Sequence, residues 1–317
     1  MPVSVVLLVI ASALAHASWN ALLKRSRDAE HAVVAMMFLA AVSGVIFAVV
    51  LRMPAPTPVS LAWCIVAGVL EAGYFVSLAR ALTRAPLGSV YTVVRGGALV
   101  VVWPVSILVL GEPITLPRAA GTLLVVLGLV ATGTSERMPA LDRSKTSTPP
   151  APTASSALSA PTALTAPTPP MSPDASKASS AWSGLAVAAG CALFVGGYHL
   201  AYKLALSSGG RPEAVVSISL STASLLNIAA LGTKRRLALA AVRAQPVRIV
   251  LGGVLASVGF LVFLSAMKDA GAGVVLTLRN TSILFAQVLA LALGERPRRL
   301  GIVGAALVTA GAILLAR

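Results

Sequence analysis

Two long apolar stretches of this sequence, residues 88–113 and 273–297, follow the same design. Each carries one arginine within its apolar part, Arg95 in the first and Arg279 in the second, and each ends in a Gly-Glu pair followed closely by proline. The arginine precedes the glutamate of that pair by 17 residues in the first stretch and by 16 in the second. This recurrence indicates an internal duplication, so we expect the chain to fold as two related halves.

The composition places most of this chain in lipid. Hydrophobic residues make up 57% of its 317 residues, charged residues only 11%, and the mean hydropathy is +0.90. A soluble domain this apolar would lack the polar side chains to cover its surface. Apolar runs of about 20 residues recur, and a helix of that length crosses the roughly 30 Å hydrocarbon core of a bilayer. The predicted fold class is therefore an all-α polytopic membrane protein in contact with membrane lipid.

Ten transmembrane helices are expected, separated by one long polar segment. Between the fifth and sixth spans, residues 135–181 are dominated by Ser, Thr, Ala and Pro, a composition that cannot bury enough apolar surface to become ordered. We therefore expect a five-helix repeat over residues 1–134, a disordered linker over 135–181, and a second five-helix repeat over 182–317. The spans are predicted at residues 3–23, 32–51, 60–81, 87–110, 116–134, 182–203, 213–231, 249–267, 272–293 and 299–316.

The two halves are expected to insert in opposite orientations. Gly68 corresponds to Gly253 and Arg95 to Arg279, with offsets that drift only from 185 to 184. Each half holds five spans, and an odd number of spans turns the second copy upside down. Inverted-topology repeats, related by an axis in the membrane plane, give alternating access a structural basis. The duplication is thus the strongest indication of transport in the sequence.

Basic residues are distributed unevenly between the loops. The odd-numbered loops hold 17 Lys and Arg residues, whereas the even-numbered loops and the C-terminus hold 6. The positive-inside rule then places the odd loops in the cytoplasm and both termini outside, in a cytoplasmic (inner) membrane. The net charge of +15 could also indicate binding to nucleic acid. The basic residues lie in short loops without aromatic interleaving, so we expect no nucleic-acid partner.

The sequence carries no signature of an enzyme, a metal site or a cofactor. Cys64 and Cys191 lie far apart in apolar helices and match no metal or redox spacing. There is no nucleotide-binding glycine loop, zinc-binding His-Glu helix or nucleophile elbow. The Gly-Glu pairs are interpreted as structural helix ends, because glycine ends a helix and a following proline stops it. We therefore expect neither enzyme activity nor a cofactor.

Polar residues in the first span share one face of its helix. His16, Asn20 and Lys24 recur at four-residue steps, and Trp19 flanks this stripe. Polar groups inside hydrocarbon are costly and usually face the bundle interior or a wet cavity. His16 is a candidate proton-coupling residue, and Asn20 and Trp19 are candidate substrate contacts. The alternative is interhelical hydrogen bonding with an interfacial tryptophan and a snorkelling lysine.

Glu71 is the only acidic residue expected deep inside a span, and Tyr74 follows it by one helical turn. A carboxylate at that depth must be protonated or paired with a cation, and the candidate partners are Arg95 and Arg279. One interpretation is a structural ion pair that fixes helix packing. The other is a proton-coupling carboxylate or a ligand for a cationic substrate group.

Arg95 and Arg279 are the candidate anion-binding residues. They lie eight and seven residues into their helices, which places them on the order of 10–12 Å below the membrane surface. Arginine's planar fork suits a carboxylate or a phosphate, although pairing with helix-end carbonyls or with an acidic residue is an equally good interpretation. Tyr91 shares a helix face with Arg95, Asn280 adjoins Arg279, and His199 in the sixth span would face the same cavity.

Several of these features resemble the EamA family of the drug/metabolite transporter superfamily. The resemblance rests on the two five-helix halves, the segment HASWNALLK at residues 16–24, and the Gly-Glu helix ends. It implies a ten-helix secondary carrier that exports amino acids or other metabolites, or exchanges sugar-nucleotides and phosphorylated sugars. The family commonly places both termini in the cytoplasm, unlike the charge distribution here. The implied cavity positions are His16, Asn20, Glu71, Tyr74, Arg95, His199 and Arg279.

The leading hypothesis is a secondary active transporter, an exporter or exchanger, that moves a small polar metabolite by alternating access. Its substrate would be an anionic or zwitterionic small molecule, and the protein would act as a monomer or homodimer. A second hypothesis is a non-transporting membrane scaffold or sensor that retained the fold. A passive channel is disfavoured, because inverted five-helix halves suit a carrier and no charged ring lines an evident pore.

Overall fold

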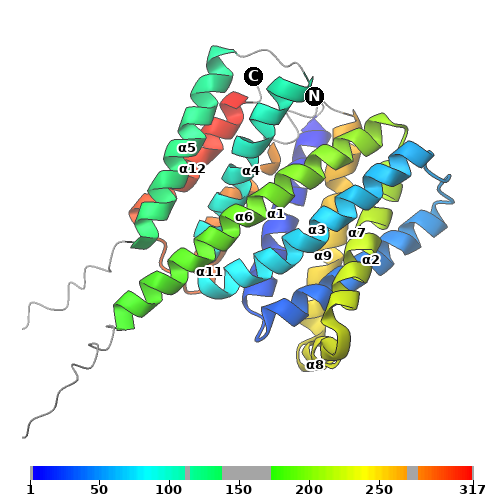
Figure 1. Cartoon of the computed structure of the whole chain (residues 1–317), viewed down its shortest axis with the longest axis horizontal. Helices are drawn as coiled ribbons and strands as arrows, with labels where there is room; N and C mark the ends of the chain where they lie inside the picture. Colours follow the sequence, from blue (N-terminus) through cyan, green and yellow to red (C-terminus); the bar gives the residue numbers. More distant parts are fainter. Residues whose placement is uncertain (1–2, 111–114, 138–172, 270–277, 316–317) are drawn as a thin grey trace, which may run out of the picture.

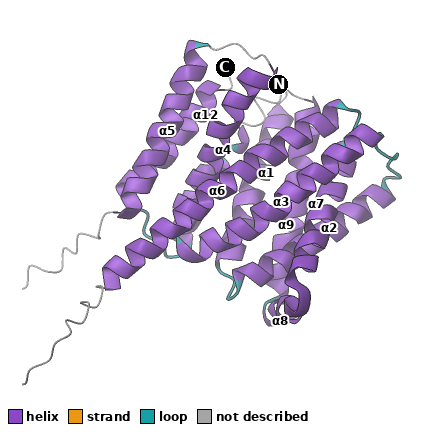
Figure 2. Ribbon diagram, in the orientation of Figure 1, coloured by secondary structure: helices purple, strands orange, loops and turns teal. Residues whose placement is uncertain are grey.

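The computed structural model describes residues 3–110, 115–137, 173–269 and 278–315. Within these ranges every regular element is a helix, as Figure 1 and Figure 2 show. The first half contains α1 (Val3–Lys24), α2 (Ala29–Val50), α3 (Pro58–Arg84), α4 (Leu87–Leu110) and α5 (Leu116–Arg137). The second half contains α6 (Pro173–Ser207), α7 (Pro212–Leu231), the 3-10 turn η1 (Gly232–Lys234), α8 (Arg235–Ala244), α9 (Pro246–Asp269), α11 (Ser282–Ala292) and α12 (Arg299–Leu315).

Helix starts follow local sequence signals. Asp28 precedes α2, and its carboxylate accepts a hydrogen bond from the backbone N–H of His31. Thr57 caps α3 in the same way, and Pro58 occupies the first helical position. Proline also begins α6, α7 and α9. A proline there loses no hydrogen bond, because the first N–H groups of a helix have no intrahelical partner.

Eight of the described helices are long and apolar enough to cross a membrane, and they coincide with the first eight predicted spans. The predicted ninth span, 272–293, lies partly outside the described residues. Its described part contains a turn at Asn280 and Thr281 before the 11-residue α11 begins, so it is not one continuous helix from 278 onward. The Thr281 hydroxyl donates to the Leu278 carbonyl at 2.6 Å, a side-chain bond that competes with helical pairing. The predicted tenth span corresponds to the 17-residue α12.

Helices extend into both ends of the predicted linker, residues 135–181. Helix α5 continues to Arg137, and α6 begins at Pro173, nine residues before the predicted start. The composition argument missed this extension because Ala and Lys among residues 174–181 are good helix formers, and Pro173 supplies a start signal. The remainder of the predicted linker, 138–172, lies outside the described residues.

A short helix that the sequence analysis did not predict, α8, connects α7 to α9. It lies at the same end of the bundle as the α1–α2 turn, where the Arg248 guanidinium donates to the Arg25 carbonyl at 2.6 Å. Leu237 and Leu239 on α8 are about half exposed, beside several basic side chains, as in helices that lie in a membrane interface. We call this end, with the α1–α2, α3–α4, α7–α9 and α11–α12 connections, the basic face. Helix α1 begins and α12 ends at the opposite end (Figure 1).

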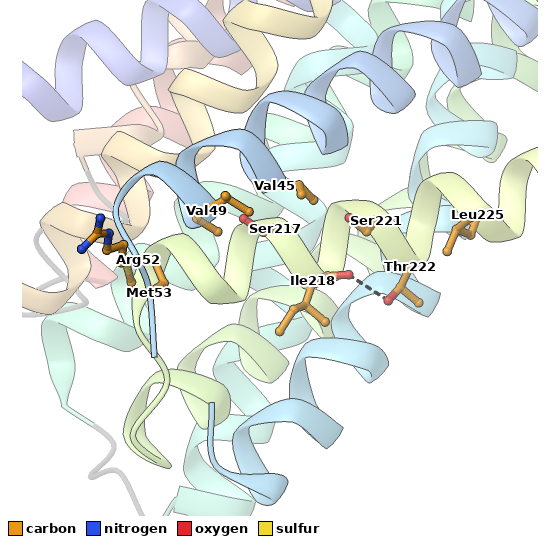
Figure 3. A pocket seen from close by; sticks show the side chains of 10 residues that line it. Val45, Val49, Arg52, Met53, Ser217, Ile218, Ser221, Thr222 and Leu225 are labelled. Atoms are coloured by element: carbon orange, nitrogen blue, oxygen red, sulfur yellow. Dashed lines mark hydrogen bonds between the residues drawn. The ribbon is translucent and has the colours of Figure 1, made fainter. Parts of the chain in front are cut away.

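The two halves of the chain are packed into one another. Helix α3 packs against α6 and α7, and α1 and α2 pack against α9. Helix α2 also packs against α7, and residues of both helices line a pocket beside this contact (Figure 3). Helix α4 contacts α6 and α11. The buried side chains of α1, α3, α6 and α9 form one continuous core, which contains Trp19, Tyr198 and Phe260. Most of the polar residues predicted as a site are buried as well.

The Gly-Glu pair of the second half forms the predicted helix end, whereas Gly111 and Glu112 of the first half lie outside the described residues. Gly294 has a φ of 80°, a left-handed conformation that glycine adopts without the steric cost of a side chain. The N–H of Glu295 donates to the Ala290 carbonyl at 2.9 Å, and the N–H of Gly294 donates to the Leu291 carbonyl at 2.9 Å. This pattern is a Schellman-type ending.

Helices α5 and α12 stand side by side at one edge of the molecule and touch through their backbones (Figure 1). A Cβ added to Gly128 would lie 2.6 Å from the Gly304 carbonyl oxygen, and one added to Gly304 would lie 2.6 Å from the Gly128 carbonyl oxygen. Gly121 and Gly311 are related in the same way, at 2.7 and 2.5 Å. Small residues permit this close approach of membrane helices. The contact joins the last helix of one half to the last helix of the other.

We predict that Gly304→Ala destabilises the protein by about 1–3 kcal/mol, because the added methyl group overpacks a backbone contact that cannot yield. Gly301→Ala in the same helix is the matched control, since its Cβ would meet only the Ser135 hydroxyl at 3.5 Å. Thermal unfolding of the purified variants in detergent measures both effects. Equal midpoints for the two variants would show that the α5–α12 contact is not tight.

Candidate functional site

His16 lies at the centre of a buried polar cluster formed by the predicted stripe on α1. His16 and Asn20 are buried, at 1% and 0% exposure, as is Trp19. The Trp19 indole N–H donates to Nδ1 of His16 at 3.2 Å, and the Asn20 amide donates to the His16 backbone carbonyl at 2.7 Å. One helix therefore positions the histidine ring through its own neighbouring side chains.

Arginines from the two halves of the chain converge on this ring. Nη2 of Arg95, on α4, contacts Nε2 of His16, and Nη2 of Arg279 contacts Nδ1 of His16 at 3.2 Å. Nη1 of Arg279 also donates to the Ser12 hydroxyl at 3.2 Å. Both guanidinium groups are buried, with Arg95 4% exposed and Arg279 0%. We call Ser12, His16, Arg95 and Arg279 the arginine cluster.

The arginine cluster holds more hydrogen-bond donors than acceptors. A neutral imidazole has one N–H and one lone-pair nitrogen. Both arginines and Trp19 present N–H groups to this one ring. Whichever nitrogen carries the hydrogen, at least one arginine faces an N–H rather than a lone pair. An additional acceptor placed between the arginines would therefore be stabilised by the cluster.

No carboxylate among the described residues lies within ion-pair distance of either guanidinium. Aromatic ring faces take the place of a carboxylate as neighbours of the two guanidinium groups. Cζ of Arg279 lies 3.8 Å from the centroid of Phe263 and 5.2 Å from that of Phe260, and Cζ of Arg95 lies 5.8 Å from the centroid of Tyr91. Such cation–π contacts favour a desolvated cation without neutralising it. The cluster keeps an excess of positive charge, which suits an anion.

Glu71 does not pair with an arginine, so the predicted ion pair is absent from the described residues. Its Oε1 accepts a hydrogen bond from the Tyr202 hydroxyl, which also lies 3.3 Å from the Ser219 hydroxyl, and its Oε2 has no partner. The face of α3 that carries Glu71 packs against α6 and α7, which supply these two hydroxyls. The rotation of α3 about its axis, which spacing alone does not determine, directs the carboxyl group away from the arginines.

A series of ring contacts leads from Tyr202, the hydrogen-bond partner of Glu71, to the arginine cluster, since the Tyr202 ring lies 6.5 Å from Phe260. We call Tyr74, Tyr198, His199 and Phe260 the aromatic layer. The Tyr198 ring stacks on His199 at 4.4 Å and lies 5.5 Å from Tyr74, and Phe260 lies 5.5 Å from the His16 ring. Nδ1 of His199 lies 2.7 Å from the Val195 carbonyl, which can only accept, so this nitrogen carries the hydrogen. Nε2 of His199 is then a buried acceptor, and it has no partner.

The structure brings most of the predicted site residues together. His16, Arg95 and Arg279 belong to the arginine cluster, and Trp19, Asn20 and Tyr91 adjoin it. Tyr74 and His199 belong to the aromatic layer, and Glu71 lies beyond that layer, where it pairs with Tyr202. Asn280 is buried next to Arg279 in the chain, at the turn before α11. The binding roles of these residues remain predictions.

Sequence reasoning missed Phe260, Phe263 and Ser12. The two phenylalanines are three residues apart on one face of α9, and aromatic residues at that spacing usually indicate ordinary core packing. Ser12 extends the four-residue stripe of α1 by one further step, and that periodicity could have identified it. No group of three or more metal-binding side chains gathers within the described ranges.

The comparisons with known proteins agree with this architecture. The model of the EamA-like transporter family matches residues 3–134 and 182–317, which together make up most of the chain. A solved crystal structure shares 18% sequence identity with this chain, covers 99% of it and 96% of its own length, and superimposes with a TM-score of 0.56. At that identity the likeness concerns the fold alone. No curated protein sequence matches at a significant level.

We predict that Tyr202→Phe destabilises the protein by about 1–3 kcal/mol, because it leaves the buried Glu71 carboxyl group without its hydrogen-bond donor. Tyr198→Phe is the matched control, since the Tyr198 hydroxyl is buried without a partner and its removal leaves no group unsatisfied. Thermal unfolding in detergent compares the two. A larger loss in Tyr198→Phe would contradict the contact described for Glu71.

Proposed function

This chain belongs to the EamA-like transporter family, and on that premise we propose that it is a secondary transporter of a small anionic metabolite that works by alternating access. The described helices are those of a multi-pass membrane protein. A fold alone does not define a substrate, so the proposal for the anion depends on the site.

The observation that carries this proposal is the arginine cluster. Two buried guanidinium groups approach one histidine, with no carboxylate near them among the described residues. Burial of unpaired charge is costly, and a carboxylate or phosphate between the arginines would supply both the missing charge and the missing acceptor. Because Arg95 and Arg279 come from different halves, the bound anion would connect the two halves.

The packing of the helices supports inverted repeats and alternating access. Exchanging the halves maps α1 onto α6, α2 onto α7, α3 onto α9, α4 onto α11 and α5 onto α12. The α1–α9 contact then becomes the α3–α6 contact, and the α2–α7, α4–α11 and α5–α12 contacts map onto themselves. This pattern is expected of two copies related by a two-fold axis, and rocking of such copies exposes a central site to each side in turn.

An unpaired polar atom near the arginine cluster supports a second feature of the substrate. Nε2 of His199 is a buried acceptor without a partner. A substrate that carries a hydroxyl or an ammonium group besides its anionic group would donate a hydrogen bond to this atom. We therefore extend the proposal to an anionic or zwitterionic molecule, with Tyr74, Tyr91, Trp19, Asn20 and Asn280 as further contacts.

His16 and Glu71 are the proposed proton-coupling residues. A proton on His16 would place a third positive charge between two arginines, so proton binding there would favour the simultaneous presence of an anion. This is the electrostatic basis for coupling anion movement to a proton gradient. Glu71 would act separately, since Tyr202 and the aromatic layer lie between it and the arginines. The proposed location is the cytoplasmic (inner) membrane, as a monomer or homodimer.

We predict that an anionic ligand stabilises the purified protein by about 2.7 kcal/mol at one hundred times its Kd. A panel of carboxylates and organic phosphates is compared with the corresponding amides and alcohols by thermal unfolding. Arg95→Gln and Arg279→Gln should abolish the shift, because glutamine keeps hydrogen-bonding capacity but removes the charge. Arg80→Gln is the control, since Arg80 is exposed and pairs with Glu30 away from the cluster. A shift that survives in both cluster variants contradicts the proposed anion site.

Transport itself is tested by counterflow in proteoliposomes. Preloading vesicles with a ligand from the panel should accelerate uptake of the labelled ligand, which a carrier does and a passive channel does not. Arg95→Ala should reduce this uptake to background while the protein remains inserted and monodisperse. A scaffold or sensor that kept the fold would bind no panel member and give no counterflow.

A further inference from the structure

Glu295 supplies the N-terminal cap of a helix in the other half of the chain. Its Oε2 accepts a hydrogen bond from the backbone N–H of Leu87 at 2.8 Å, at the first residue of α4. The residues that precede α4 are Ala85 and Pro86, neither of which has a polar side chain that could act as a cap. The first N–H groups of a helix lack intrahelical partners and carry partial positive charge, so a carboxylate is favoured there.

Lys24 connects the ends of α1 and α3 to Glu295. Its Nζ lies 3.5 Å from Oε1 of Glu295 and donates to the carbonyls of Leu82 at 2.5 Å and Ala85 at 2.6 Å. The ends of α1, α3 and α11 and the start of α4 therefore meet through two charged side chains. We call Lys24, Leu87 and Glu295 the basic-face latch.

The latch lies at the basic face, at the level where α1 ends and α4 begins. Lys24 follows His16 by eight residues on α1, and Leu87 precedes Arg95 by eight on α4, which is about 12 Å along each helix axis. Between these two levels, α4 and α11 are in contact. The Gln287 amide donates to the Thr92 hydroxyl at 3.4 Å, and Gly88 leaves room for the Gln287 side chain. Helices α1, α4 and α11 are therefore in contact with one another between the arginine cluster and the latch.

We propose that the basic-face latch is a gate: it closes the arginine cluster off from the basic face and breaks each time the cluster becomes accessible from that side. This inference rests on the proposed transport function. Lys24 and Glu295 are about one-fifth exposed, so water can replace their contacts when they separate. The α5–α12 contact is different in kind, because its touching backbones leave no space for water.

The gate is tested by the chemical accessibility of a cysteine placed behind it. Thr92→Cys, in a Cys191→Ala background, places a thiol on α4 between the latch and Arg95, at a position where the Thr92 side chain is fully buried. Native Cys64, buried in the first turns of α3 away from the latch, remains as an internal reporter of unfolding. The protein is held in lipid nanodiscs, and a charged maleimide measures both labelling rates by peptide mass.

We expect Glu295→Ala to accelerate labelling of Thr92→Cys roughly tenfold, the factor that corresponds to losing about 1.4 kcal/mol from one charge-assisted hydrogen bond. Labelling of Cys64 should not change. Glu30→Ala is the matched control, because Glu30 also forms an ion pair at the basic face, with Arg80 at 3.4 Å, but lies outside the path. Lys24→Met should act non-additively with Glu295→Ala, since both remove the same contact.

Two results would overturn the gate. Unchanged labelling of Thr92→Cys in Glu295→Ala would show that the latch does not control access. A parallel rise at Cys64 would show that Glu295 holds the whole bundle together. If the alanine variant does not fold, Glu295→Gln retains an acceptor for the Leu87 N–H and loses only the charge, and the same comparison applies with an expected rise of about threefold. Labelling requires no substrate, so a failed anion shift leaves this test intact.

Discussion

The burial of two arginine charges in an apolar bundle is the constraint on which the rest of this structure depends. A charge at the centre of a bilayer costs about 2.5–3.5 kcal/mol on insertion scales, and here Arg95 and Arg279 lie beside the same histidine. The surroundings lower this cost with donors, acceptors and ring faces: Ser12, His16 and the phenylalanines of α9. None of these groups cancels the charge. The arginine cluster thus remains incompletely satisfied, as is expected of the binding site proposed for it.

Most of the helices, and His16, Arg95 and Arg279 as candidate site residues, could be predicted from the sequence because they follow simple periodicity and an internal repeat. Apolar runs determine where helices cross lipid, and the four-residue step of His16 and Asn20 places them on one face. The duplication indicated that Arg95 and Arg279 occupy equivalent positions, and their meeting near His16 follows from two halves that pack together. The family-level prediction is confirmed by the match over both halves.

Other features depend on information that spacing does not contain. The partner of Glu71 is determined by how far α3 is rotated about its axis. A membrane helix that is apolar on all sides has no polar face from which that rotation could be inferred. The turn at Asn280 depends on a local side-chain bond of Thr281, and α8 lies in a stretch whose basic residues suggested a loop. The role of Glu295 as a cap for α4 involves residues 208 positions apart, so no local pattern indicates it.

The glycine contact between α5 and α12 has a mechanical consequence. Two helices whose main chains touch at four glycines are expected to move as one rigid pair, and this pair contains one helix from each half. Rocking of the two halves would then have to leave α5 and α12 in contact. Any large movement would then require bending next to the α5–α12 pair. In the first half this would be α4, which contains Pro104, and in the second half the turn that precedes α11. Bending of α4 and of the turn before α11 would bring Arg95 and Arg279 together or apart while α5 and α12 keep their positions.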